Sequence, residues 1–168
     1  GGLQAMLDDV VQILYRDGYI RTPVAGDLVL TEHSGGYQAV ALNLDAVTEG
    51  GQVLAAHLFD GLYGYMSAYE DFARSGAFFR SVYTTAGGTR ANNLELVDLL
   101  DDVVESADAT SLRDERAVIW FTPAGHSDST WWEQAYSETL RWGATNHRRG
   151  PRIELRTATV SGGTATVT

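Results

Sequence analysis

The stretch LVLTEHSGGYQAVA, residues 28–41, contains an apolar run, then a serine followed by two glycines, then a segment of helical character. The apolar run has the length and composition of a strand that is buried on both faces. Residues 37–47 have the apolar spacing of a helix. Ser34 is therefore expected at the point where a buried strand turns into a helix.

The same strand and helix unit recurs along the chain. Further strand-like runs occupy residues 52–60, 77–85 and 116–122, and helix-like segments follow at residues 69–74, 92–105 and 130–142. An amphipathic helix with one buried stripe is expected over residues 3–17, before the first strand. Strands that alternate with helices predict an α/β fold, namely a three-layer α/β/α arrangement with a mostly parallel sheet of about four strands.

The length and the end of the chain suggest how it is organised. With 168 residues and 44% hydrophobic residues, the chain can form one domain with a real core. We expect this domain to cover residues 1–147. Residues 148–168 are expected to form a C-terminal β-hairpin or an edge extension, because IELRTATV and TATVT flank a Ser-Gly-Gly turn.

The composition argues against several classes of partner and site. The net charge is −10, from 22 acidic and 12 basic residues, and all the basic residues are arginine. A nucleic-acid partner is not expected, because a phosphate-binding surface needs clustered positive charge. No apolar run reaches the roughly 20 residues that a membrane span needs. The absence of cysteine excludes a disulfide, a thiolate zinc site and a cysteine nucleophile.

Three chemically capable residues follow three of the expected strands, in the order Ser34, Asp60 and His126. In open parallel sheets, ligands bind outside the carboxyl ends of the strands. A serine hydroxyl becomes a useful nucleophile when a histidine accepts its proton, and a carboxylate then orients the imidazole and stabilises its charged form. The three residues therefore predict a catalytic triad.

These motifs carry a resemblance to a known family. H-S-G-G-Y, L-F-D-G-L-Y-G and G-H-S-D, within residues 27–142, are similar to the corresponding segments of bacterial α/β-hydrolase-like proteins of the G-H-S-G type, in the C-terminal half of that fold. The resemblance implies a serine hydrolase that cleaves an ester or amide through an acyl-enzyme, without a cofactor. Ser34 would be the nucleophile, Asp60 the acid and His126 the base, and Gly35 would give a backbone N–H to the oxyanion hole.

The chain differs from the family pattern at three points. The family has a small residue two positions before the serine, where this chain has Glu32. The family acid most often follows the next strand, but loop 84–89 contains no carboxylate, and the role therefore falls to Asp60. The family also has several strands before the nucleophile, so either a preceding N-terminal segment or a partner chain completes the fold, or the protein is a reduced variant with an incomplete oxyanion hole.

Aromatic residues after the Asp60 and His126 loops are expected to bind the substrate, a small molecule or a polymer, and they are Tyr63, Tyr65 and Trp131. His33 directly precedes the serine, and its side chain is expected to point away from the serine into the packing around the sheet.

Two other functions compete with the hydrolase hypothesis. Ser34 could simply cap the following helix, and the domain would then be a catalytically inactive, hydrolase-like binding or assembly module. A metal-dependent hydrolase could instead use His57, Asp60 and His126. No metal site is expected, however, because the spacing of His57 and Asp60 on a strand places their side chains on opposite faces.

Overall fold

The computed structural model of the chain describes residues 2–86, 88–101, 103–106, 116–127, 158–161 and 164–167. Its elements are, in order, α1 (Leu3–Arg16), β1 (Leu28–His33), the 3-10 turn η1 (Ser34–Gly36), α2 (Tyr37–Ala41), β2 (Val53–Phe59), α3 (Met66–Arg74), β3 (Phe78–Tyr83), α4 (Arg90–Leu99), β4 (Val103–Ser106), β5 (Ala117–Phe121), β6 (Ala158–Ser161) and β7 (Thr164–Val167).

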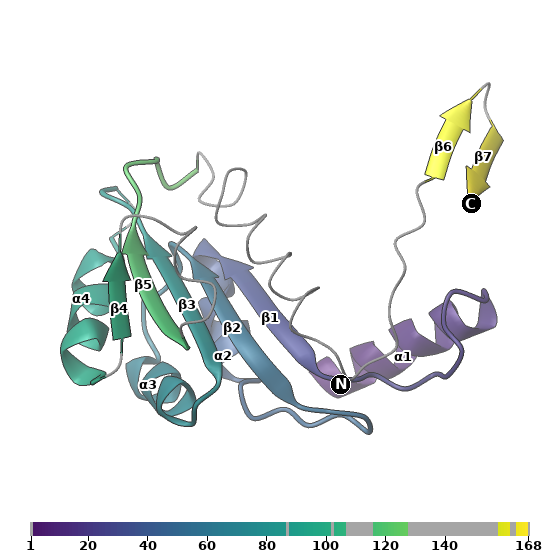
Figure 1. Cartoon of the computed structure of the whole chain (residues 1–168), viewed down its shortest axis with the longest axis horizontal. Helices are drawn as coiled ribbons and strands as arrows, with labels where there is room; N and C mark the ends of the chain where they lie inside the picture. The colour runs from purple at the N-terminus through teal and green to yellow at the C-terminus, as the bar shows by residue number, and fades with distance from the viewer. Residues whose placement is uncertain are drawn as a thin grey trace.

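Strands β1 to β5 form a single sheet in the order β1-β2-β3-β5-β4, and all its neighbouring strands are parallel (Figure 1). This confirms the predicted α/β class. The carboxyl ends of the strands therefore lie along one edge of the sheet. Strands β6 and β7 pair in antiparallel fashion as a separate two-stranded sheet, which agrees with the predicted C-terminal hairpin.

Strand β4 was not predicted from the sequence. Residues 92–105 were expected to be one helix, but α4 ends at Leu99 and the backbone is already extended at Leu100. Val103 and Val104 then begin β4, which pairs with β5. Two adjacent β-branched residues favour the extended chain over the helix, and they supply the physical reason for the difference.

The three helices α2, α3 and α4 contribute to one hydrophobic core on one face of the sheet. Register partners from four neighbouring strands supply the sheet side of this core, for example Leu30, Ala56, Phe79 and Ala117. On the opposite face Phe59, Val82, Val118 and Trp120 form a second, smaller cluster of buried apolar side chains. The helix expected at residues 130–142, which would be part of a third layer, lies outside the described residues.

Helix α1 forms where the sequence predicted it, but the expected buried stripe is wrong. None of its residues is buried, and Met6, Val10 and Ile13 on its apolar side are exposed. The helix lies beyond the β1 edge of the sheet (Figure 1). Leu3, Leu7, Val11 and Leu14 are half-buried, so the apolar side of the helix is covered only in part.

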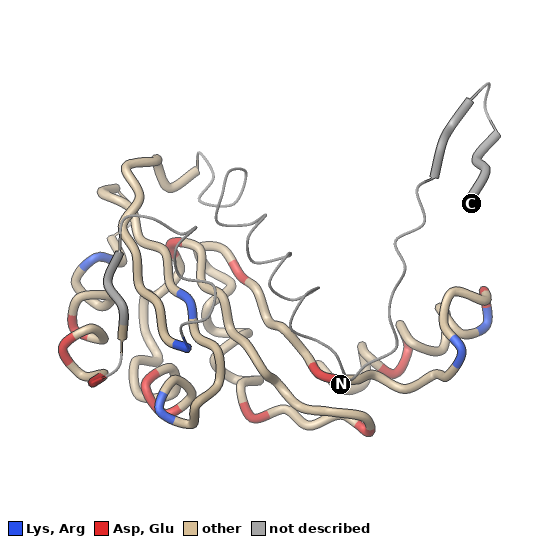
Figure 2. Tube along the Cα trace, viewed as in Figure 1, with Lys and Arg blue, Asp and Glu red and all other residues tan. Residues whose placement is uncertain are grey.

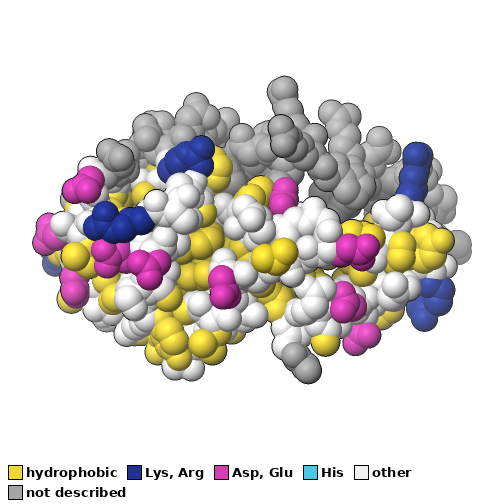
Figure 3. All heavy atoms as spheres, turned by 90° about the horizontal axis from the view of Figure 1, so that it is seen from below, with side chains coloured by type: hydrophobic (Ala, Val, Ile, Leu, Met, Phe, Trp, Pro, Cys, Tyr) yellow, Lys and Arg dark blue, Asp and Glu magenta, His cyan; other side chains and the backbone are white. Residues whose placement is uncertain are grey.

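Charged residues are spread along the described chain, with acidic residues on α1, α3 and α4 (Figure 2). Figure 3 views the molecule from the amino ends of the strands, where single acidic side chains are scattered among apolar ones. In the part of the chain that the structure describes, no helix combines the length and the apolar character that crossing a membrane requires.

Candidate active site

Ser34 lies in a strained turn at the carboxyl end of β1. Its φ of 59° is in the left-handed region, which residues other than glycine seldom adopt. The 3-10 turn that it begins leads directly into α2. A sharp turn between a strand and a helix exposes the serine hydroxyl above the edge of the sheet, as the nucleophile elbow of a serine hydrolase requires.

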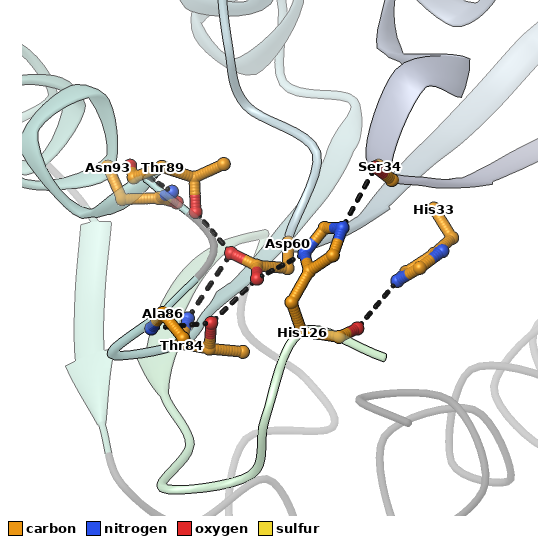
Figure 4. Close-up of polar contacts among 8 residues, drawn as sticks. All are labelled: His33, Ser34, Asp60, Thr84, Ala86, Thr89, Asn93 and His126. Carbon is orange, nitrogen blue, oxygen red and sulfur yellow. Dashed lines mark hydrogen bonds and ion pairs between the residues drawn. The ribbon is translucent and has the colours of Figure 1, made fainter. Parts of the chain in front are cut away.

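His126 lies between Ser34 and Asp60 and is hydrogen-bonded to both (Figure 4). Its Nε2 is 2.9 Å from Ser34 Oγ, and its Nδ1 is 2.7 Å from Asp60 Oδ2. Because a carboxylate only accepts hydrogen bonds, Nδ1–H donates to Asp60, and in the neutral ring Nε2 accepts the Ser34 proton. The three residues follow β1, β2 and β5, so the ends of three parallel strands bring them together.

Asp60 is completely buried and is held by hydroxyl and amide donors from the loop after β3. Thr84 Oγ1 donates to Oδ2 at 2.6 Å and the Thr84 amide donates to Oδ1 at 3.3 Å, while Thr89 Oγ1 also donates to Oδ1. Burial by itself raises the pKa of Asp60. The hydrogen bonds from Thr84, Thr89 and His126 outweigh burial and lower the pKa below its usual value, so the carboxylate is ionised.

Sequence reasoning missed the role of loop 84–89, which it noted only for lacking a carboxylate. The loop provides the donors that hold the carboxylate of the preceding strand. Asn93 supports it further, because its Nδ2 donates to the Thr89 carbonyl at 2.9 Å and its Oδ1 accepts from Ser81 at 2.5 Å. The only available sequence signal was a threonine at each end of this loop, at Thr84 and Thr89.

His33 does not point into the packing around the sheet as expected. It is exposed, and its ring stacks on that of His126 with the ring centroids 4.9 Å apart. Its Nε2–H donates to the main-chain carbonyl of His126 at 2.9 Å (Figure 4). The hydrogen bond and the ring contact connect the end of β1 to the loop that follows β5. They therefore help to fix the position of the loop that carries His126.

Glu32 is buried beneath the serine turn, with only 8% of its surface exposed. Burial raises the pKa of its carboxyl to about 8, the backbone of Phe59 opposes this shift, and the negative charge of Asp60 adds to it. Glu32 is therefore a neutral acid at neutral pH. A neutral carboxyl can be buried beside Asp60 without the repulsion that a second carboxylate would cause.

Two glycines make room for Glu32. A Cβ added to Gly61 would lie 2.0 Å from Glu32 Oε1, and one added to Gly36 would lie 2.9 Å from Glu32 Cβ. Both distances are shorter than side-chain atoms tolerate. The family pattern has its small residue at position 32 itself. In this chain the residues opposite Glu32 are small instead, namely Gly36 in the serine turn and Gly61 directly after Asp60.

The structure describes two of the three predicted substrate-binding aromatics. Tyr63 is 38% exposed, and its ring meets that of His126 edge-on with the ring centroids 6.4 Å apart. Tyr65 packs against Tyr37 with a centroid distance of 6.1 Å. Trp131 lies outside the described residues.

Gly35 and the predicted oxyanion site lie next to Ser34 in η1. A Cβ added to Gly35 would meet no atom within 4 Å. The side of Gly35 on which a side chain would project is therefore open space.

His57 belongs to the interior of β2, where it is 1% exposed and pairs in register with Arg80 of β3. Burial, together with the positive charge of Arg80, lowers the pKa of His57 to about 3, and the ring is neutral. Among the residues that the structure describes, no group of three or more histidine, cysteine, aspartate or glutamate side chains could hold a metal ion.

No protein-family model, curated protein or solved structure matches the chain.

Proposed function

We propose that this protein is a serine hydrolase of the α/β-hydrolase type, which cleaves an ester or amide through an acyl-enzyme. The observation that carries the proposal is His126, which is hydrogen-bonded through one ring nitrogen to Ser34 and through the other to the buried Asp60. A serine, a histidine and a carboxylate in this order of contacts form a proton relay for nucleophilic catalysis.

In the proposed reaction, Ser34 Oγ attacks the substrate carbonyl carbon while its proton moves to His126 Nε2. The carbonyl π electrons move to the oxygen, which becomes an oxyanion and accepts a hydrogen bond from the Gly35 N–H. Collapse of the tetrahedral intermediate breaks the bond to the leaving group, which takes the proton from His126. Water then attacks the acyl-enzyme by the same route and releases Ser34.

The environment of Asp60 supports this assignment. Its lowered pKa keeps the carboxylate ionised, so it can stabilise the imidazolium that forms on His126. The left-handed backbone of Ser34 also supports the assignment, because strain of this kind persists where the surrounding structure enforces it and is frequent at active sites.

The proposal is tested with a fluorophosphonate probe, which reacts with activated serines. We expect the intact chain to be labelled on Ser34, and we expect Ser34→Ala to remove the labelling. His126→Ala should reduce it by about 1000-fold or more, because the serine then loses its base. Ser127→Ala, which changes an exposed serine next to His126, is the matched control and should label like the original protein.

Folded protein that shows no labelling between pH 6 and 9 would overturn the hydrolase proposal. That result would favour the inactive binding module. The hydrogen bonds of His126 to Ser34 and Asp60 would then only stabilise the three loops that carry these residues.

A further inference from the structure

His33 lies directly before the nucleophile, and the proposed reaction does not use it. Its exposed ring stacks on that of His126, with 29° between the ring planes and the centroids 4.9 Å apart. Its Nε2 also lies 2.9 Å from the main-chain carbonyl oxygen of His126 (Figure 4). A carbonyl only accepts hydrogen bonds, so Nε2 carries a proton and Nδ1 of the neutral ring carries the lone pair. A second proton therefore enters at Nδ1 and leaves this hydrogen bond intact.

The loop that carries His126 leaves the sheet at Thr122. The Thr122 amide still donates to the Tyr83 carbonyl at 2.9 Å, which continues the pairing of β5 with β3. The next main-chain donor, the Ala124 amide, bonds to Thr122 Oγ1 at 3.3 Å and so stays within the loop. In the described part of this loop, residues 122–127, the hydrogen bond from His33 is therefore the one that connects the main chain at His126 to the sheet.

We propose that His33 is a positioning residue of the proton relay: its hydrogen bond and ring stack hold His126 in line with Ser34, and protonation of its own ring opposes the relay. This inference rests on the proposed function of Ser34. When Ser34 attacks, His126 changes from a neutral ring to a cation. A neutral His33 ring lies against that cation without repelling it. A protonated His33 instead places a second positive charge on a ring whose centroid is 4.9 Å away.

The other titratable groups around the two stacked rings do not cancel this repulsion. Asp60 lies at Nδ1 of His126, and its charge is the same before and after the serine proton moves. Tyr63 meets the edge of the His126 ring and is uncharged in neutral and acid solution. Glu32 precedes His33 on β1, and its side chain projects from the other face of the strand. Among the described residues, no carboxylate forms an ion pair with His33.

The experiment measures the rate of fluorophosphonate labelling against pH in the original chain and in His33→Phe, which keeps a ring but removes the donor and the titratable nitrogen. At about pH 8 the variant should label about 3- to 10-fold more slowly, because the hydrogen bond to the His126 loop is lost. Between about pH 8 and pH 5 the original chain should lose roughly tenfold more of its rate than the variant, because only the original gains the second charge. Thr31→Val, at an exposed position on the same face of β1, is the matched control and should follow the original chain at each pH.

Hydrolysis of p-nitrophenyl acetate gives a second readout: His33→Phe should lower kcat and leave KM nearly unchanged, because His33 acts through His126. Urea unfolding of each variant separates loss of rate from loss of fold. If the original chain labels on Ser34 and the pH profile of His33→Phe has the same shape, the role of His33 is overturned while the hydrolase proposal stands. If the original chain does not label at all, the hydrolase proposal fails, and this role of His33 fails with it.

Discussion

Thr84 is the residue whose hydroxyl shares Asp60 Oδ2 with His126. Its Oγ1 and the His126 Nδ1 lie 2.6 Å and 2.7 Å from that oxygen. Neighbouring donors on one carboxylate oxygen fix the direction in which it faces. The orientation of the histidine ring therefore depends on a threonine hydroxyl that binds the same carboxylate oxygen.

Replacing Thr84 with valine tests this dependence. Valine keeps the shape of threonine and removes the donor to a fully buried carboxylate, which is expected to cost about 1–3 kcal/mol of unfolding free energy. We also expect slower labelling of Ser34, because His126 is held less firmly. Thr84→Ser, which retains the hydroxyl, is the matched control. Equal urea midpoints for the two variants would contradict the assigned role of the hydroxyl.

At the scale of elements, the turn after β1 and the loop after β2 pack against each other through Glu32. The carboxyl of Glu32 fills the space that Gly61 leaves in the loop after β2, while on the serine turn a Cβ added to Gly36 would overlap the Glu32 Cβ. This contact sets the distance between the loop that carries Ser34 and the loop that carries Asp60.

Substitution of Gly61 by alanine is expected to destabilise the fold by about 1–3 kcal/mol, because the new Cβ overlaps the Glu32 carboxyl. In the Glu32→Ala background the same substitution should cost much less, because the overlapping atoms are gone. The difference between these two costs measures the contact directly. Gly26→Ala, where an added Cβ meets no atom within 4 Å, is the control and should be nearly neutral. Additive effects of the Glu32 and Gly61 substitutions would show that they do not interact.

Sequence periodicity was sufficient for the elements that have a regular apolar pattern and a clear boundary. It predicted strands β1, β2, β3 and β5, whose apolar runs end at glycines or polar residues. The proximity of Ser34, Asp60 and His126 follows from the parallel sheet, because strands of one direction end at one edge. Strand β4 was missed, since a short strand of four residues has too few positions to show a period.

Features that depend on two distant residues could not be predicted in the same way. Nothing in the sequence near Glu32 shows that Gly61 gives it room, and nothing near Thr84 shows that its hydroxyl meets Asp60. Likewise, the pattern of α1 shows that the helix has an apolar side, but not whether another element covers it. Apolar spacing along the sequence indicates which face of a single element is apolar. The contacts described here are made between two elements, and that spacing does not indicate them.

At the scale of the whole molecule, two buried groups of opposite type should shape the dependence of stability on pH. Glu32 loses its proton near pH 4.5 when unfolded but near pH 8 when folded, so stability falls as pH rises through this interval. His57 gains its proton near pH 6.5 when unfolded but near pH 3 when folded, so stability falls as pH decreases from 6.5 to 3. Asp60, with its lowered pKa, adds to the loss on the acid side.

Between about pH 4.5 and 6.5 the contributions of Glu32 and His57 have opposite slopes, and we expect stability to be greatest there. Above this range each pH unit should cost up to about 1.4 kcal/mol until Glu32 is ionised. Urea unfolding at a series of pH values measures the curve. Glu32→Gln, which cannot ionise, should remove the alkaline decline and leave the acid decline. An unchanged alkaline decline in this variant would assign it to another group.

Ser34 and His126 are separated by 92 positions in the chain, yet their side chains are in hydrogen-bond contact. Strands β2 and β3 lie between the strands that carry them, so the contact depends on three strand pairings being in register at once. Such long-range pairings form late when a chain folds, because the entropy of closing large loops must be overcome first. A nascent or partly folded chain therefore lacks the contact between Ser34 and His126, and the proposed proton relay can form only after these strands have paired.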